Sequence, residues 1–253
     1  MSVWFDDGRA AGAGRGRRGQ SGTAPGLDRE RITAATVRLL DAEGPAKFSM
    51  RRLAADLGVT AMSLYWYVDS KDDLLELASD AVMGEVELPE APPPGGDWQS
   101  RIRDLAAGYR ALLIRHPWLS PLVGRFLNVG PNWSAFALCV QRIIRSTGLA
   151  PEHQTGALAA VFQFVYGFGT IEANFLKRCA ESGLTQDQFF SYAMGAISRE
   201  PELTPVVDAS REMVEARGGQ TVQEMRDRDF AFALDVLIAG IEARRRDSLP
   251  DPR

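Results

Sequence analysis

The sequence predicts an all-α protein in two parts. From residue 27 onward, apolar residues recur every three to four positions, which is the spacing of amphipathic helices. Capping residues precede several of these stretches, and no stretch alternates between apolar and polar residues as a half-buried strand would. The Pro- and Gly-rich segment 89–97 cannot continue a helix. We interpret it as a linker between an N-terminal part, 27–88, and a larger C-terminal part, 98–247.

Residues 1–26 are rich in Gly, Ala and Arg and show no hydrophobic period. We expect this arm to be disordered in the absence of a partner. Arg15, Arg17 and Arg18 would let it reach into a DNA minor groove beside a DNA-binding module. A solvated tail without that role has the same composition, and both interpretations stay open.

Four helices are predicted in the N-terminal part. The first lies between Asp28, which can cap it, and Gly44, and the second covers about 50–57. A third runs from about residue 60 through 67. The fourth starts with a capping-box-like sequence at Ser70 and continues to about residue 87.

The C-terminal part is predicted to be helical almost throughout. The expected helices cover approximately residues 98–115, 117–124, 131–147, 151–180, 185–198, 204–216 and 221–246. Cys139 and Cys179 lie in apolar, helix-like surroundings without metal-ligand or disulfide spacing, so we interpret both as packing residues.

Composition argues against an enzyme and against a membrane protein. The chain has two histidines, no nucleophile elbow, no phosphate loop and no paired metal ligands, so we expect no catalytic residues, no metal site and no cofactor. Charge or glycine interrupts the apolar stretches before the roughly 18 residues of a membrane span, and no signal-peptide pattern opens the chain. A cytoplasmic protein is expected.

The net charge of −4 is distributed unevenly. Up to residue 71 the chain has 11 Lys and Arg against 8 Asp and Glu, and the remainder has 18 against 25. This small asymmetry supports nucleic-acid binding only if particular side chains are placed to meet phosphate groups.

Segment 49–67 matches a helix-turn-helix. Two short helices are joined by a turn at Gly58, and small or polar residues open the second of them, followed by three aromatic residues at 65–67. Small residues let the end of a recognition helix enter the major groove, while hydroxyl and indole donors behind them reach phosphate oxygens. The segment therefore predicts DNA binding.

Residues 49–75, SMRRLAADLGVTAMSLYWYVDSKDDLL, resemble the DNA-binding signature of TetR-type repressors. The resemblance covers about residues 27–88 strongly and the remainder more weakly, through RHPWLSPL at 115–122 and the helix plan. It implies a DNA-binding domain followed by a C-terminal domain that binds an effector and dimerises. The DNA contacts that it implies are Ser49, Met50, Arg51, Thr60, Ala61, Met62, Ser63, Tyr65, Trp66, Tyr67 and Lys71.

These residues have different expected roles. Arg51 can bind guanine through two hydrogen bonds, whereas Ala61 and Met62 offer only apolar contact with a thymine methyl group. The aromatic residues and Lys71 would hold phosphates. Tyr67, three residues after a predicted core leucine, could equally belong to the core.

The resemblance also implies that helices 151–180 and 221–246 form a four-helix bundle with a second copy. A continuous apolar stripe on the last helix suits that contact, namely Phe230, Leu234, Leu237, Ile238 and Ile241. Packing inside one chain would require the same stripe, so this alternative stays open.

Aromatic residues with few polar neighbours predict a site for a small, mainly apolar effector in the C-terminal part. The candidates are Trp118, Phe126, Trp133, Phe136, Phe162, Gln163, Tyr166, Phe168, Glu172 and Phe175. Any single one of these aromatics could instead be ordinary core. Tetracycline-sensing members of the family use histidine and magnesium, and Gln163 stands about where a ligand-contacting histidine would fall, so metal-dependent sensing is not expected.

The sequence thus predicts a ligand-responsive repressor that binds a palindromic double-stranded DNA operator as a homodimer. The alternative is a dimeric DNA-binding regulator without a small-molecule effector.

Overall fold

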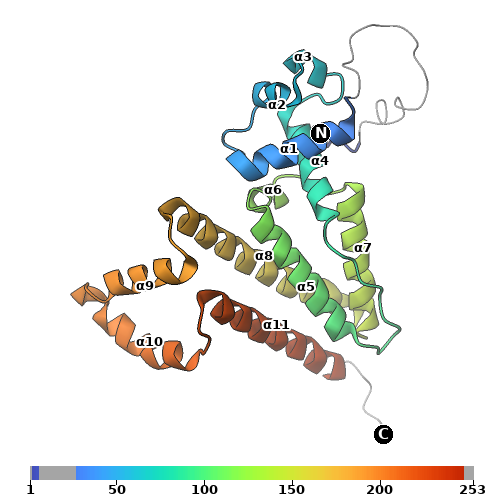
Figure 1. Cartoon of the computed structure of the whole chain (residues 1–253). Helices are drawn as coiled ribbons and strands as arrows, with labels where there is room; N and C mark the ends of the chain where they lie inside the picture. Colours follow the sequence, from blue (N-terminus) through green and yellow to red (C-terminus); the bar gives the residue numbers. More distant parts are fainter. Residues whose placement is uncertain (1, 6–26, 248–253) are drawn as a thin grey trace. The chain divides into compact units, whose positions relative to one another are not determined.

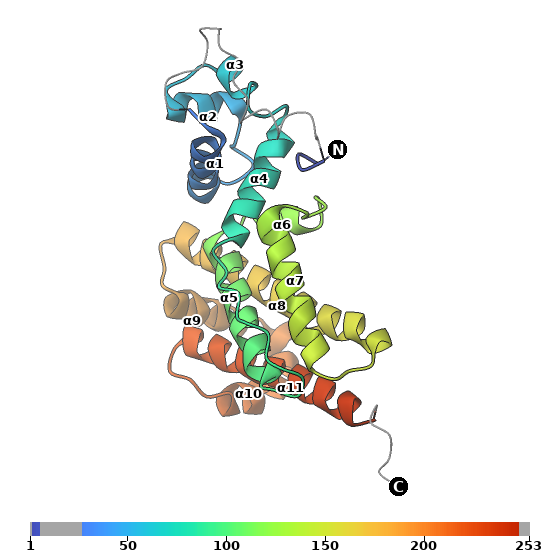
Figure 2. The same cartoon turned by 90° about the vertical axis from the view of Figure 1, so that its right-hand side faces the viewer.

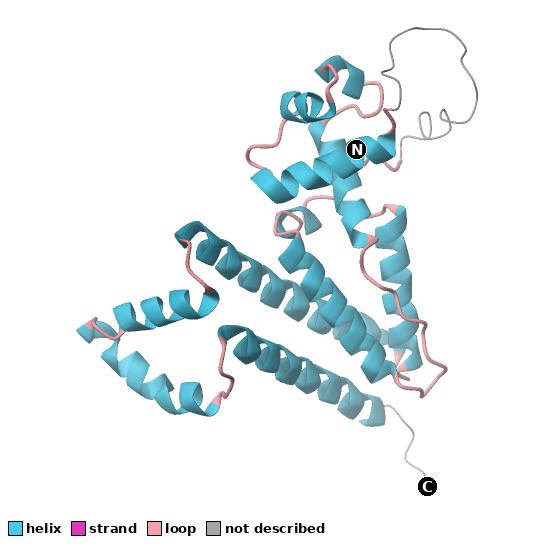
Figure 3. Cartoon of the chain, in the orientation of Figure 1, coloured by secondary structure: helices cyan, strands magenta, loops and turns pink. Residues whose placement is uncertain are grey.

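The computed structural model describes residues 2–5 and 27–247, and every regular element in these ranges is a helix (Figures 1 and 3). The predicted all-α class is confirmed. The chain divides into two compact units, Met1–Ser146 and Thr147–Arg253. Residues 98–146 belong to the first unit because helices beyond the proline-rich segment pack against the N-terminal helices.

The first unit begins with α1 (Arg29–Glu43), α2 (Met50–Leu57), α3 (Ala61–Leu64) and α4 (Lys71–Met83). The predicted caps are present, since side-chain oxygens at positions 28, 49, 60 and 70 each accept a backbone N–H of the following helix. Two helices are shorter than the sequence predicts. The third ends at Leu64, whose carbonyl accepts the N–H groups of both Tyr67 and Val68, and α4 ends at Met83, before Gly84.

Helix α4 connects the two halves of this unit. It packs on α1 through its first half and on α6 (Ser120–Val123) and α7 (Pro131–Ser146) through its second half (Figure 2). Helix α5 (Trp98–Arg115) packs on α7. Buried apolar side chains run along α4 on both sides, including Leu74, Leu75 and Met83. The position of α4 is therefore fixed by contacts with both halves.

Residues 2–5 lie against α4. The Ser2 hydroxyl and the backbone N–H of Val3 both donate to the carboxylate of Glu76, which is buried, and the Arg29 guanidinium lies 5.7 Å from the ring centre of Trp4. The arm predicted for residues 1–26 otherwise falls outside the described residues.

The second unit contains α8 (Pro151–Ser182), α9 (Gln186–Ile197), a 3₁₀ turn (Pro201–Leu203), α10 (Thr204–Ala216) and α11 (Val222–Asp247). Helices α8 and α11 run side by side (Figure 1), and the rings of Phe164 and Phe168 pack on Phe230 with centroid distances of 5.5 and 5.2 Å. Helices α9 and α10 contain no buried residue.

Helix α8 is long and apolar enough to cross a membrane by length and composition alone. The sequence prediction that no stretch reaches this length was too strict, because a helix tolerates isolated glycines and one or two charges within an apolar span. A long central helix of a helical domain meets the same criteria, and α8 packs on α9 and α11 of its own unit.

Candidate DNA interface and effector site

The helix-turn-helix exposes two of the three aromatic residues that the sequence assigns to DNA, Tyr65 and Trp66, together with Met62. Met62, Tyr65 and Trp66 are 69%, 46% and 75% exposed, while Leu64 is fully buried and anchors α3. A large apolar side chain that is mostly exposed contributes little to the core. The exposed side chains of α3 and of the turn that follows it are therefore available for a partner.

The hydroxyl groups of the predicted interface begin the two helices. Ser49 Oγ accepts the N–H of Arg52 at 3.2 Å, and Thr60 Oγ1 accepts the N–H of Ser63 at 3.2 Å. The hydroxyls of Thr60 and Ser63 also lie 2.9 Å apart. Ser49 and Thr60 thus position α2 and α3, whatever further contacts their hydroxyls make.

The arginines of this region fall into two groups. Arg52 Nε and Nη2 donate to the Glu43 carboxylate at 2.9 and 2.7 Å, and this hydrogen bond raises the pKa of Arg52 above its ordinary value. Arg51 is exposed and has no ion-pair or hydrogen-bond partner among residues 2–5 and 27–247. Of these two neighbours, Arg51 is the one whose guanidinium is available to a base.

Lys71 and Tyr67 are engaged within the fold. The Lys71 ammonium donates to the carbonyl oxygens of Phe48 and Pro45 at 2.7 and 3.3 Å, and it lies 5.4 Å from the Phe48 ring centre. The Tyr67 hydroxyl donates to the Leu27 carbonyl at 2.7 Å. Tyr67 thus ties the helix-turn-helix to the segment before α1, and Lys71 ties the start of α4 to the loop between α1 and α2. The sequence did not indicate these contacts.

Four candidate effector residues lie in the first unit. Trp118, Trp133 and Phe136 are buried, and the two indole N–H groups donate to Asp41 and Ser79. Phe136 packs on Trp133 and also on Tyr109. Trp133 and Phe136 are therefore part of a packed aromatic core, and Trp118 is buried beside the His116 ring at a centroid distance of 5.7 Å.

The fourth, Phe126, borders a pocket of about 400 Å³, a volume at the small end for ligand sites. The lining is more acidic than an apolar effector site requires, and consists of Ser2, Ser70, Asp72, Asp73, Glu76, Arg125, Phe126 and Leu127.

The other six candidates lie on α8 in the second unit. Phe162, Tyr166, Phe168 and Phe175 are half-buried, and Gln163 is exposed. Glu172 is completely buried, and its Oε1 accepts a long hydrogen bond of 3.4 Å from the Gln223 amide. The candidate set is thus divided between the two units.

Sequence reasoning missed the residues that surround the end of α8. The Phe175 ring packs on Phe189 at a centroid distance of 5.6 Å. The Arg226 guanidinium lies 4.2 Å from the centre of the Phe175 ring. Together with Glu172 and Gln223 they form a mixed aromatic and polar group. These residues lie on three helices, α8, α9 and α11, that are far apart in the sequence, so no local sequence pattern predicts that they meet.

The predicted dimer stripe lies largely inside the chain. Phe230, Leu234, Ile238 and Ile241 are buried, and Leu237 is half-buried. Packing within one chain accounts for this stripe. The apolar residues that α8 and α11 do expose are different ones, namely Ile171, Phe232 and Val236, which are 67%, 73% and 54% exposed.

Two family models match the chain. "Bacterial regulatory proteins, tetR family" matches residues 32–78, and "Tetracyclin repressor-like, C-terminal domain" matches residues 88–245, which is more than half of the sequence. The chain belongs to the TetR family. It is therefore a helix-turn-helix DNA-binding regulator of transcription, from a family of regulators rather than enzymes.

Proteins related in sequence to this TetR-family chain are also named as HTH-type transcriptional regulators. An HTH-type transcriptional regulator of Saccharopolyspora erythraea is 40% identical over 154 residues, which is 61% of this chain and 64% of that protein. The HTH-type transcriptional repressor DrrR1 of Streptomyces coeruleorubidus is 31% identical over 239 residues, covering 93% of this chain and 86% of DrrR1.

Among solved structures, apo ActR of Streptomyces coelicolor superimposes with a TM-score of 0.70 at 27% identity, over 90% of this chain and all of ActR. ActR in complex with actinorhodin gives a TM-score of 0.69 at 27% identity, over 87% and 97% of the two chains.

Proposed function

We propose that this TetR-family repressor binds a palindromic operator as a homodimer and leaves it when a small, mainly apolar effector binds. The observation that carries the DNA-binding part is the exposed edge formed by Arg51, Met62, Tyr65 and Trp66. One helix-turn-helix buries too little DNA surface for tight specific binding, and two copies reading half-sites about 34–36 Å apart are the usual solution.

Exposed apolar residues on two helices support the homodimer. Ile171 on α8 and Phe232 and Val236 on α11 are mostly exposed. A Cβ added at Gly156 or Gly167 of α8 would meet no atom within 4 Å, so a neighbouring helix could approach closely there. We propose this face, rather than the predicted inner stripe, as the contact with the second copy.

The effector part of the proposal derives from the aromatic residues of α8 and from ActR, whose complexes with actinorhodin and (S)-DNPA are known. In this chain, Glu172 would orient the ligand, and the rings of Phe168 and Phe175 would cover it. Binding would favour a state in which α4 tilts and the two recognition helices move apart, with a coupling free energy of about 1–3 kcal/mol.

Fluorescence anisotropy on an operator duplex, selected from a random library, tests DNA binding. Arg51→Ala is expected to weaken binding by about 1–3 kcal/mol and to relax sequence preference at one position of each half-site. Arg101→Ala is the matched control, because Arg101 lies on α5 and forms an exposed ion pair with Asp104. Equal binding by both variants would contradict the assignment of Arg51.

Calorimetry separates the effector-responsive repressor from a regulator that only dimerises. The titrants are aromatic, weakly polar compounds, with actinorhodin among them. A responsive repressor gives heat with one of them and loses operator affinity in its presence, and Glu172→Gln weakens both effects. Absence of heat and of any change in operator affinity across such a panel would support the dimeric regulator without effector. In either case we propose a cytoplasmic protein without membrane contact.

A further inference from the structure

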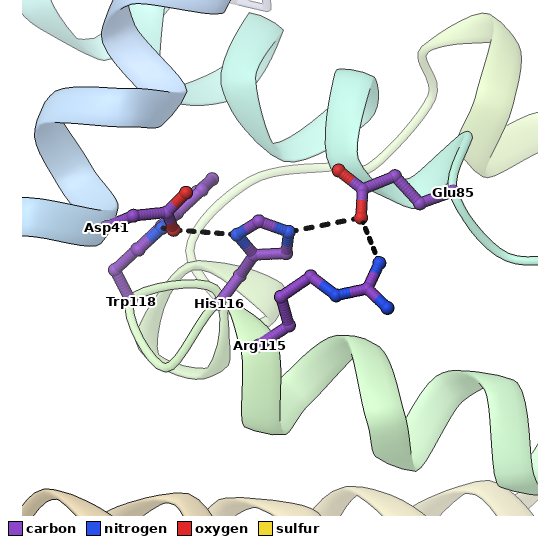
Figure 4. Close-up of polar contacts among 5 residues, drawn as sticks. All are labelled: Asp41, Glu85, Arg115, His116 and Trp118. Atoms are coloured by element: carbon purple, nitrogen blue, oxygen red, sulfur yellow. Dashed lines mark hydrogen bonds and ion pairs between the residues drawn. The ribbon is translucent and has the colours of Figure 1, made fainter.

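A buried histidine joins three segments of the Met1–Ser146 unit (Figure 4). His116 follows α5 as its C-terminal cap, and its side chain is 4% exposed. The ring Nδ1 lies 2.7 Å from Oδ1 of Asp41 in α1, and Nε2 lies 3.2 Å from Oε2 of Glu85, two residues beyond the end of α4. One side chain thus links α1, the end of α4 and the start of the α6 region.

Two neighbouring donors complete the network. Trp118 Nε1 donates to Asp41 Oδ1 at 2.6 Å, and Arg115 Nη1 donates to Glu85 Oε2 at 2.6 Å. Ionised carboxylates only accept hydrogen bonds, so both ring nitrogens of His116 can donate only when the imidazole carries both protons. The two carboxylates are then balanced by one guanidinium and one imidazolium, and the charges of the group sum to zero.

The two sides of the network differ in strength. The Arg115 side chain is 61% exposed, and ion pairs of exposed groups contribute little. The side chains of Glu85 and Asp41 are similarly exposed, at 37% and 35%, but the ring lies closer to Asp41, at 2.7 Å against 3.2 Å. Burial raises the pKa of Glu85, but hydrogen bonds and charges from Arg115 and His116 outweigh it and place the pKa below its ordinary value. Asp41 instead receives two N–H donors from a buried ring and a buried indole. The contact with Asp41 is therefore the stronger constraint on α1.

Helix α1 supports the helix-turn-helix, because it packs on both α2 and α4 and because the Tyr67 hydroxyl donates to the carbonyl of Leu27, two residues before α1. We propose that His116 is a positioning residue for operator binding, which holds Asp41, and with it α1, in the orientation that places α2 and α3 on DNA. This inference rests on the proposed operator binding. It assigns to His116 a role outside both the DNA surface and the effector site.

Two amide substitutions distinguish the contact with Asp41 from the contact with Glu85. The amide nitrogen of Asn takes about the position of Nδ1, and the amide nitrogen of Gln takes about the position of Nε2. His116→Asn can still donate to Asp41, whereas His116→Gln can donate only toward Glu85. Loss of one hydrogen bond to a charged group predicts about 10- to 30-fold weaker operator binding for His116→Gln. His116→Asn is expected to stay within about threefold of wild type, since it keeps that bond.

His153→Gln is the matched control, because His153 is the other histidine of the chain and is exposed on α8. Operator affinity is measured by anisotropy at neutral pH, with far-ultraviolet circular dichroism to establish that each variant is folded. Wild type and His153→Gln are expected to bind the operator equally. Affinity retained by His116→Asn and lost by His116→Gln distinguishes positioning through Asp41 from mere loss of the ring. Asp41→Asn removes the charge that faces Nδ1 of His116 and should weaken operator binding as well.

If His116→Gln fails to fold, Asp41→Asn alone decides, because it changes the group that faces Nδ1 and leaves the ring in place. Equal operator affinity for wild type, His116→Gln and Asp41→Asn would overturn the role of His116. Absence of operator binding by the wild-type chain would instead refute the proposed function.

Discussion

Asp80 of α4 caps a different helix, and its removal gives a sharp stability prediction. Its Oδ1 accepts the backbone N–H groups of Asn132 and Trp133 at 3.1 and 3.0 Å, in the first turn of α7. Gly130 leaves the required space, because a Cβ at that position would overlap the carboxylate. The first N–H groups of a helix have no partner within it, so α7 depends on this carboxylate from α4.

Asp80→Ala leaves two N–H groups without their acceptor. Each buried N–H group without an acceptor costs about 1–3 kcal/mol. Part of this loss is offset because the wild type buries an ionised carboxylate, so the free energy of unfolding should fall by about 2–4 kcal/mol in total. At about 3 °C per kcal/mol for a chain of this size, Tm should fall by about 6–12 °C. Gly130→Ala is expected to lower Tm as well, since the added methyl group displaces the carboxylate.

The pH dependence has a definite sign. Burial raises the pKa of Asp80 more than the hydrogen bonds from Trp133 and Asn132 lower it. The folded chain therefore holds the proton to higher pH than the unfolded chain does. Stability contributed by Asp80 is greatest below its unfolded pKa, about 3.9, and decreases as pH rises through the folded pKa. Asp80→Asn should lack this decrease.

Urea unfolding followed by tryptophan fluorescence measures these effects, with Asp104→Ala as control. Asp104 is exposed and pairs with Arg101 at 3.7 Å, so the control should change the unfolding free energy by less than about 0.5 kcal/mol. A similarly small change for Asp80→Ala at pH 7 would refute the capping role.

Three further predictions concern separate surfaces. Trp66→Ala should weaken binding to selected and random duplexes alike, by about tenfold in anisotropy titrations, because an exposed indole N–H suits phosphate rather than a base edge. Glu76→Ala should release residues 2–5, with loss of hydrogen-exchange protection at Val3 and about 1–2 kcal/mol of stability. Phe232→Glu should convert a dimer to monomers in light scattering, whereas retention of the dimer would exclude the exposed face of α11.

The helices and their starting points could be predicted because their signals are local. Asp28, Ser49, Thr60 and Ser70 each cap a helix that begins at the next residue, and each bond spans three positions. Helix ends were harder to predict, as in α3, where the aromatic residues after Leu64 fit a helical spacing but lie in a turn.

Contacts between distant positions could not be predicted. Lys71 was assigned to phosphate from its place at a helix start, yet its ammonium meets carbonyl groups 23 and 26 residues earlier. Asp80 reaches a helix 52 residues later. The dimer stripe was ambiguous for another reason, since α11 has apolar residues on its inner and outer faces and periodicity does not say which face meets a second copy.

The most direct test of the proposed function is in vitro selection of duplexes by the wild-type chain, followed by hydroxyl-radical footprinting on the enriched sequence. We predict an inverted repeat whose half-sites are separated by whole helical turns of about 10–10.5 base pairs, protected by two copies of the chain. Arg51→Ala should abolish the preference at one base pair in each half-site. Enrichment of no sequence, or protection of a single half-site by one copy, would contradict operator recognition by a homodimer.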